Sequence, residues 1–192
     1  MNVYDFDQTV FNPDCSFCFF LYSLRHHPRA VSTALPVAFW QLLLFLKNGK
    51  KDAKKLKEAL FSYLNRIDDV LGLVDSFWEE NFSRIEPWYL EQKRDDDLII
   101  SASPAFLLEP AAEKLGVRLL ATPMNPYTGK IHGKNCHDQE KLRRFREKYA
   151  EAAVEEFYSD SLSDAPMAEI AHRAFLVVGT ERKVWPEKNK GR

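Results

Sequence analysis

The chain has few cysteines and no marked excess of either charge. Its three cysteines, Cys15, Cys18 and Cys136, are an odd and sparse set among 192 residues, which fits a reducing cytosol rather than a disulfide scaffold. Cys15 and Cys18 have a CxxC spacing, but a structural zinc site would need a second pair, so we interpret them as two small residues on one helix face. A formal net charge of -1 argues against a general nucleic-acid binder.

The sequence also predicts neither a secretory signal nor a membrane-spanning segment. No charged leader precedes an apolar run at the N-terminus, and residues 1–6 have a strand pattern, so we expect no secretory signal. The most apolar stretch, residues 30–46, is shorter and more interrupted than the roughly 20 apolar residues of a membrane span. We therefore expect a cytoplasmic protein. With 45% hydrophobic residues, the chain can build one core domain with a small insertion.

Short apolar runs alternate with helical patterns in the second half of the chain. Strands are predicted at residues 2–6, 97–101, 117–122, 154–160 and 174–179. Between them we predict helices at residues 104–116, 138–149 and 164–172. The first half reads as mostly helical, in the segments 14–27, 30–46, 67–82 and 84–94. Strands that alternate with helices predict an α/β fold, with a Rossmann-like parallel sheet flanked by helices.

Polar residues follow several of the predicted strands. Asp5 and Asp7 come after the first strand, Ser101 after "LII" and Asp160 after "EEFY". In parallel sheets ligands collect at the carboxyl ends of the strands, so we expect these residues to face one crevice. With Asp164, up to four carboxylates would meet there, and they would repel one another unless a cation lay among them. Hard oxygen ligands in an open site favour Mg²⁺.

Groups that bind anions are predicted at the same edge of the sheet. Ser101 carries a hydroxyl, and "SASP" runs into a helix N-terminus at Pro104, where free backbone N–H groups make an anion site. Lys141, in the first turn of the "DQEKLRRF" helix, can supply positive charge. With a metal ion these groups form a phosphate cradle. A carboxylate that faces a bound phosphoryl group can attack it, and a second carboxylate can protonate the leaving alcohol.

Four segments resemble the four motifs of the haloacid dehalogenase superfamily of phosphohydrolases: "DFDQT", "LIISAS", a lysine ahead of the last strands, and "YSDSLSD". The motifs occur in the same order, and the resemblance spans nearly the whole chain. It implies a Mg²⁺-dependent phosphomonoesterase that works through an aspartyl-phosphate. True dehalogenases of the superfamily lack the second acid, Asp7, so its presence here favours a phosphatase.

The resemblance also implies roles for the carboxylates. Asp5 would be the nucleophile and Asp7 the general acid/base. The ion, Mg²⁺, would be held by the Asp5 carboxylate, the Asp7 backbone carbonyl and Asp160. Asp164 would support the water shell of the metal.

The residues that would bind phosphate, by the same resemblance, are Ser101, Ala102, Lys141 and Thr9. Thr9 would also support the turn of the first motif. Two points depart from a simple match to the family. Lys134 is an alternative to Lys141 as the phosphate-binding lysine. Position 8 is Gln, where the family commonly has Gly, and this side chain would narrow the entrance beside the nucleophile.

The helical first half is expected to be an inserted cap. The resemblance implies a core domain at residues 1–12 and 95–192 and a helical cap at residues 13–94, as in the phosphoserine-phosphatase-like branch, subfamily IB. Such a lid would exclude water from the crevice and select the substrate.

The predicted cap contains an apolar stretch with basic residues on both sides. "AVSTALPVAFWQLLLFL" is preceded by Arg25, His26, His27 and Arg29 and followed by a lysine-rich segment that starts at Lys47. This pattern suits either a core helix of the cap or an interfacial helix on anionic lipid. The stretch and "EFYSDSLSDAPM" together resemble the phosphatidylglycerophosphate phosphatase group, whose substrate is a lipid phosphate at the inner membrane face. Small phosphate monoesters, a lipid phosphate and a non-catalytic membrane-associated module stay open, as does the oligomeric state.

Overall fold

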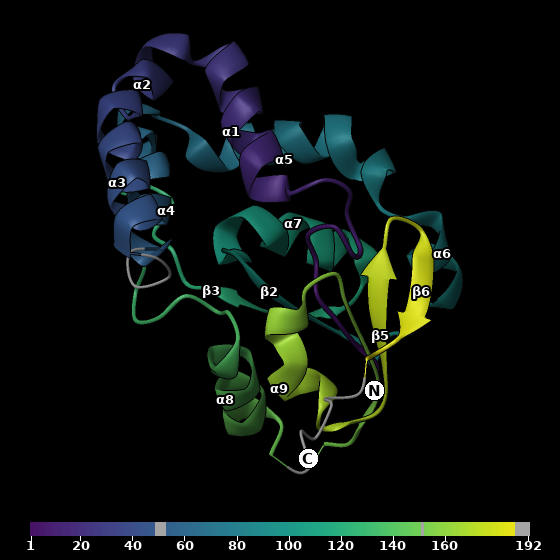
Figure 1. Ribbon diagram of the computed structural model, residues 1–192. Coiled ribbons are helices and arrows are strands. Elements are labelled where there is room, and N and C mark those ends of the chain that lie inside the picture. The colour runs from purple at the N-terminus through teal and green to yellow at the C-terminus, as the bar shows by residue number, and fades with distance from the viewer. Residues whose placement is uncertain (49–52, 151, 187–192) are drawn as a thin grey trace.

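The computed structural model describes residues 1–48, 53–150 and 152–186, and its centre is a six-stranded sheet with the order β3-β2-β1-β4-β5-β6 (Figure 1). The strands are β1 Val3–Tyr4, β2 Leu98–Pro104, β3 Arg118–Thr122, β4 Val154–Ser159, β5 Ala171–Val178 and β6 Glu181–Val184. Neighbouring strands are parallel except that β6 pairs antiparallel with β5. The predicted α/β fold with a mostly parallel sheet flanked by helices is confirmed.

Helices make up most of the remaining described chain. They are α1 Cys15–His26, α2 Pro28–Ser32, α3 Leu35–Asn48, α4 Ala53–Leu60, α5 Val70–Asn81, α6 Pro87–Gln92, α7 Ala105–Leu115, α8 Gln139–Lys148 and α9 Ala165–Ala168. Short 3-10 turns lie at η2 Ser62–Arg66, η3 Phe82–Arg84 and η4 Leu162–Asp164. Helix-capping residues explain two of the boundaries. The Asp14 side chain accepts a hydrogen bond from the N–H of Phe17 at the start of α1, and Gly116, in the left-handed conformation, ends α7.

The short strand β1 lies at the centre of the sheet and is fully buried. Val3 pairs with Leu98 of β2 on one side and with β4 on the other. Alternate residues of a strand point to opposite faces. Accordingly Val3 and Leu98 pack with Phe145 of α8, whereas Tyr4 packs on the other face with helices that include α5 and α7. The buried strands therefore fix where the chain leaves the sheet.

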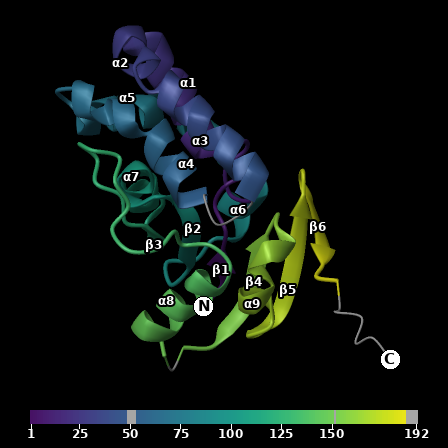
Figure 2. The same cartoon turned by 60° about the vertical axis from the view of Figure 1, so that its left-hand side comes forward.

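The helices α1 to α5 gather at one end of the molecule, away from α8 and α9 (Figure 2). They are not a separate body, because one apolar cluster includes Phe77 and Trp78 of α5 and Phe106 of α7. The indole N–H of Trp78 also donates to the carbonyl of Leu107 at 2.6 Å. The helix α6, inside the segment predicted as cap, packs against the sheet, where its Gln92 donates to the Tyr4 hydroxyl at 3.1 Å.

Two predictions at the C-terminal end differ from the structure. The predicted helix at residues 164–172 is shorter, since α9 ends at Ala168 and β5 already begins at Ala171. The antiparallel edge strand β6 was not predicted, because "ERKV" has no apolar alternation and its residues are exposed. It forms by pairing back onto β5 after a turn at Gly179. Among the described residues, no helix is both long and apolar enough to cross a membrane.

Candidate active site

The parallel strands β1, β2 and β4 bring the polar motifs to one edge of the sheet. Asp5 follows β1, and its backbone N–H donates to a carbonyl of β4 at 2.8 Å. Asp160 comes directly after β4. Ser101 lies inside β2 rather than after its end, at the point where pairing with β3 is interrupted between Ile100 and Pro104. Neighbouring strands thus deliver residues that are far apart in the sequence to one place.

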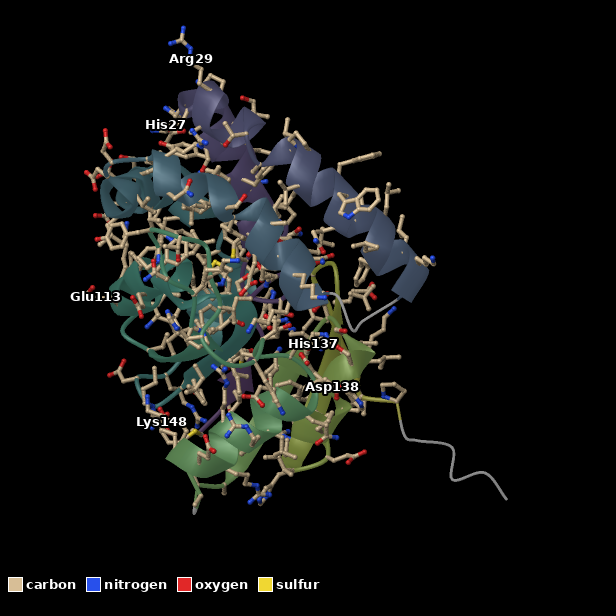
Figure 3. The ribbon with its side chains drawn as sticks, turned by 90° about the vertical axis from the view of Figure 1, so that its left-hand side faces the viewer. His27, Arg29, Glu113, His137, Asp138 and Lys148 are labelled. Carbon is tan, nitrogen blue, oxygen red and sulfur yellow. The ribbon has the colours of Figure 1, made fainter. Side chains whose placement is uncertain are left out.

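Lys141 is the positive group that joins two of the predicted carboxylates. Its ammonium nitrogen lies 2.8 Å from Oδ1 of Asp5 and 2.6 Å from Oδ2 of Asp164, and it is almost fully buried. Lys141 lies in the first turn of α8, where its backbone N–H donates to the carbonyl of Asp138 at 3.0 Å; Asp138 is labelled in Figure 3. The alternative lysine, Lys134, is exposed. The geometry therefore places Lys141, and not Lys134, among the carboxylates.

The carboxylate of Asp164 is buried, and only one of its two oxygens accepts hydrogen bonds from the described residues. Its Oδ2 accepts from Lys141 and, at 2.8 Å, from the hydroxyl of Ser159. Its Oδ1 is buried and has no hydrogen-bond partner among the described residues. A buried carboxylate oxygen without a donor is costly. This oxygen is therefore a ready ligand for a cation or for a water molecule bound to one.

Asp160 is held through its backbone by the first motif. Its N–H donates to the hydroxyl of Thr9 at 3.0 Å, and Thr9 is fully buried. Burial raises the pKa of Asp160 to about 6; the Lys141 ammonium lowers it, and the carboxylate of Asp164 raises it. Asp160 therefore lies within electrostatic reach of the same lysine as Asp5. In this arrangement Thr9 orders the loop that carries Asp160.

The charges around Lys141 do not balance. Burial raises the pKa of Asp5 to about 7, against the effect of Lys141 and with the help of Asp164 and Asp7. Burial lowers the pKa of Lys141, but the carboxylates of Asp5 and Asp164 outweigh it, so the net shift is upward. The pKa values of both members of this ion pair are raised, but for different reasons. Lys141 has enough negative charge around it to stay protonated, whereas Asp5 has too little positive charge around it to offset its burial. A further cation would correct this imbalance.

Asp7 is fixed by two donors, one at the start of α1 and one in β2. Its Oδ1 accepts from the backbone N–H of Cys15 and its Oδ2 from the hydroxyl of Ser103, both at 2.6 Å. Ser103 in turn shares a 2.8 Å hydrogen bond with Ser16. Ser103 was not predicted as a site residue. The signal was in the sequence, because Ser101 and Ser103 are two residues apart on one strand and so share a face.

The carbonyl of Ala102, another predicted site residue, joins β2 to the helix α4. It accepts from the ammonium of Lys57 in α4 and from the hydroxyl of Thr122, both at 2.7 Å. Burial lowers the pKa of Lys57, while the carboxylate of Asp7 raises it. Ser101 is fully buried, and its hydroxyl accepts from the N–H of Ser103 at 3.0 Å. A cationic group of α4 thus reaches the phosphate end of the predicted site.

The donor set suits a hard, partly hydrated cation. Among the described residues, no three His, Cys, Asp or Glu side chains converge to hold a metal ion by themselves. Mg²⁺ does not require such a cage, because it keeps several waters and binds through one or two carboxylates and substrate phosphate oxygens. The partnerless Oδ1 of Asp164 and the shortage of positive charge at Asp5 both fit this ion.

A mostly parallel α/β sheet with carboxylates and a buried lysine at its carboxyl edge is the arrangement that the four-motif resemblance implied. The model of the family described as haloacid dehalogenase-like hydrolase matches residues 3–169. The chain therefore belongs to this family, as the motif resemblance predicted. Among curated proteins, none matches the chain.

Solved structures share the fold over nearly the whole chain. A protein with unknown function from Bordetella pertussis Tohama I aligns with a TM-score of 0.76 and 20% identity, over 92% of this chain and 88% of that one. A phosphoserine phosphohydrolase-like protein from Francisella tularensis aligns at 0.55 with 17% identity, over 92% and 87%. A probable phosphoserine phosphatase from Vibrio cholerae aligns at 0.60 with 14% identity, over 90% and 55%. At these identities the likeness concerns the fold.

Proposed function

We propose that the protein is a Mg²⁺-dependent phosphomonoesterase that works through an aspartyl-phosphate on Asp5. One observation supports this most directly: Lys141 is shared by Asp5 and Asp164 in a buried cluster that lacks positive charge. A lone lysine cannot neutralise these carboxylates, whereas a divalent ion and a phosphate dianion together would complete the charge pattern. Family membership provides the chemical context for this arrangement.

The orientation of Asp5 suits it for attack. Among the described residues, the donors that reach Asp5 are the backbone N–H of Phe6 and the ammonium of Lys141, and both bind Oδ1. Its Oδ2 is the oxygen that would attack phosphorus. The bond from phosphorus to the ester oxygen then breaks, and the phosphoryl group is transferred to Asp5. Lys141 stabilises the negative charge of the phosphoryl oxygens.

Asp7 would act first as the general acid and then as the general base. It donates a proton to the departing alkoxide and later takes one from the water that hydrolyses the aspartyl-phosphate. In the structure both of its oxygens accept hydrogen bonds, from Cys15 and Ser103. Asp7 therefore has to release at least one of these donors to act as an acid. Both donors lie at the junction with the cap, so the position of α1 would influence this step.

Magnesium would be held by the carboxylates of Asp5 and Asp160 and by the backbone carbonyl of Asp7, with Asp164 bound to its water shell. When bound, the ion neutralises the phosphoryl oxygens and the surplus carboxylate charge. Ser101, the backbone at Ala102, and Lys141 would bind the phosphoryl oxygens. Thr9 would act through Asp160, whose backbone it holds.

The substrate would be a phosphate monoester, either small or carried by a lipid. The solved relatives named for phosphoserine favour a small substrate. A lipid phosphate, as in the phosphatidylglycerophosphate phosphatase group, is the second candidate, because α3, within the proposed cap, exposes large apolar side chains. We also propose residues 13–94 as the cap and a cytoplasmic location, which the three free thiols of Cys15, Cys18 and Cys136 support.

Turnover of a soluble aryl phosphate, together with acid-quenched mass spectrometry, tests the mechanism. We expect activity in Mg²⁺, loss of activity in EDTA, and one added phosphoryl group on the wild-type protein. Asp5→Asn should abolish both turnover and the added mass while circular dichroism stays unchanged. Matched Asp95→Asn, on the exposed surface, should behave as wild type. Full activity of Asp5→Asn would refute the mechanism, and activity without added mass would refute the intermediate. A panel of water-soluble and lipid phosphates then identifies the substrate class.

A further inference from the structure

The helix α3, Leu35–Asn48, has its polarity reversed compared with an ordinary surface helix. Such helices turn their apolar side to the protein and their polar side to water. In α3 the exposed side carries large apolar residues, with Phe39, Trp40 and Leu46 exposed to 63%, 61% and 71%. Further exposed apolar residues of α3 are Leu35, Val37, Leu42 and Leu43. We define this set of seven side chains as the α3 face.

The periodicity of α3 shows that most of this face is continuous. At about 100° per residue, Leu35, Phe39, Leu42, Leu43 and Leu46 fall on one side of the helix. The opposite side, which faces the protein, holds the one polar residue in the middle of the helix, Gln41. Figure 3 shows α3 along the outer edge of the cap, with its side chains projecting away from the body. Contiguous exposed apolar surface of this kind marks an interaction site.

The charge around the α3 face restricts what can bind there. Residues 15–51 contain none of the 28 acidic residues of the chain. Exposed basic residues lie at both ends of the face: Arg25 and Arg29 precede it, and Lys47 lies in the last turn of α3. Arg29 projects from the tip of the cap in Figure 3. An apolar strip between basic ends complements a surface that is apolar inside and anionic outside.

The length of α3 fits a helix that lies on a membrane rather than one that crosses it. Its 14 residues extend about 21 Å, which is less than the roughly 30 Å hydrocarbon thickness. Aromatic residues such as Phe39 and Trp40 favour the boundary between lipid headgroups and acyl chains. A helix in this plane would bury its apolar side chains while Arg29 and Lys47 contact lipid phosphates.

We propose that the α3 face docks the protein onto an anionic phospholipid membrane. The docking does not depend on the proposed phosphatase activity, because Asp5 and Lys141 belong to the core and the α3 face belongs to the cap. A lipid surface fits better than a second copy of the chain, since two copies would bring their basic ends together. If the phosphatase assignment also holds, docking would keep the enzyme next to phosphorylated lipids or products made at the membrane.

Vesicle co-sedimentation of the full chain tests this proposal. We expect the protein to bind phosphatidylcholine vesicles that contain phosphatidylserine, and to bind less as salt increases or when phosphatidylserine is left out. The double variant Phe39→Ser/Trp40→Ser should bind at least about tenfold more weakly, because it removes large apolar area. Arg29→Gln and Lys47→Gln should each weaken binding about fivefold.

Controls separate docking from folding and catalysis. Val184→Ser removes an exposed apolar side chain from β6, far from the α3 face in sequence, and should bind vesicles as wild type. Asp5→Asn should bind fully even when it has no turnover, and each α3 variant should keep its turnover of a soluble aryl phosphate. The proposal is overturned if wild-type protein does not bind, or if the double variant binds equally well. It is also overturned if the face instead forms a dimer that the double variant dissociates.

Discussion

The ammonium nitrogen of Lys141 lies 2.8 Å from a carboxylate oxygen of Asp5, although Asp5 follows the first strand of the chain and Lys141 lies in α8, after β3. The contact is largely buried, with the Lys141 side chain 2% and the Asp5 side chain 12% exposed. Lys141 also holds Asp164 at 2.6 Å, which makes it the common partner of the first and the last motif. Among the described residues, Lys141 is thus the cation that holds Asp5 and Asp164 together.

Removing that cation tests how much the cluster depends on it. Lys141→Met should leave Asp5 and Asp164 as buried, unpaired carboxylates and lower the free energy of unfolding in EDTA by about 3 to 5 kcal/mol. Turnover in Mg²⁺ should fall by at least about 100-fold, because a group that stabilises phosphoryl charge is lost. Urea unfolding and an aryl phosphate assay measure the two effects. Lys134→Met, on the surface, is the matched control and should change neither; equal loss in both variants would contradict the assignment.

Gln8 occupies a backbone conformation that suits glycine. Its φ is 56°, in the left-handed region, and the side chain is exposed beside the first motif. The cost of this conformation for a residue with a Cβ is about 1 kcal/mol. Gln8→Gly should therefore raise the free energy of unfolding by up to about 1 kcal/mol, measured in urea. Glu113→Gly in helical α7 should do the reverse and lower it by about the same amount. A loss of stability in Gln8→Gly would contradict the interpretation.

Gly129 and Gly133 form a natural pair for testing the junction between α4 and the loop before α8. Both have positive φ, 67° and 81°. A Cβ on Gly129 would lie 2.4 Å from the carbonyl oxygen of Phe61, whereas a Cβ on Gly133 would meet nothing within 4 Å. Gly133→Ala should thus cost only the backbone strain of about 1 to 2 kcal/mol. Gly129→Ala should cost clearly more, because Phe61 and α4 must move.

Chemical denaturation and aryl phosphate turnover measure the consequence of moving α4 in Gly129→Ala. Lys57 reaches Ala102 from α4, so displacement of α4 in Gly129→Ala should lower turnover as well as stability. Gly133→Ala should keep turnover. If the two alanine variants are equally stable, the close approach to Phe61 does not constrain the fold.

Glu140 stabilises the first turn of α8 in a pH-dependent way. Its carboxylate accepts hydrogen bonds from Arg143 and Arg144. These bonds lower the pKa of Glu140 from 4.5 to about 2, and the bond from Arg143 has the larger effect. A carboxylate with a lowered pKa stabilises the fold above the unfolded pKa and loses this effect as pH falls toward the folded pKa. Glu140→Gln should therefore unfold a few degrees below wild type at pH 7. The gap should close between about pH 4.5 and pH 2.

Thermal unfolding followed by circular dichroism across this pH range measures the difference. Glu147→Gln is the matched control, because Glu147 is exposed and pairs with Arg143 at the far end of the same helix. Its melting temperature should stay close to that of wild type at every pH. A constant gap between Glu140→Gln and wild type down to pH 2 would show that charge is not the cause.

The sequence allowed five strands of the sheet and the motif order to be predicted, because the relevant patterns are local, whereas the roles of the site residues stay predictions. The apolar run of β2 and the acids after β1 and β4 are visible without tertiary information. The α/β fold and the family are confirmed. The choice between Lys134 and Lys141 was open in the sequence, since both are lysines in polar surroundings. Only the packing of α8 decides which one is buried among carboxylates.

Other features needed the three-dimensional structure. The edge strand β6 has no apolar periodicity, so only its pairing with β5 reveals it. The sequence of α3 is apolar nearly all round, and the pattern cannot say that Gln41 faces inward while Phe39 and Trp40 face outward. Asp7 was predicted as the general acid/base, and its two hydrogen bonds from Cys15 and Ser103 depend on how α1 meets β2, which the sequence does not show.

The bond between the Trp78 indole and the Leu107 carbonyl has a consequence for protein engineering. Because the inserted helices and the sheet share one apolar interior, neither can be exchanged as an independent module. A chimera that receives this helical insertion on another sheet would have to import the partner surface of α7 as well. Otherwise the transplanted indole N–H would have no acceptor, the apolar surfaces would not fit, and we expect the hybrid to misfold before its specificity could be assayed.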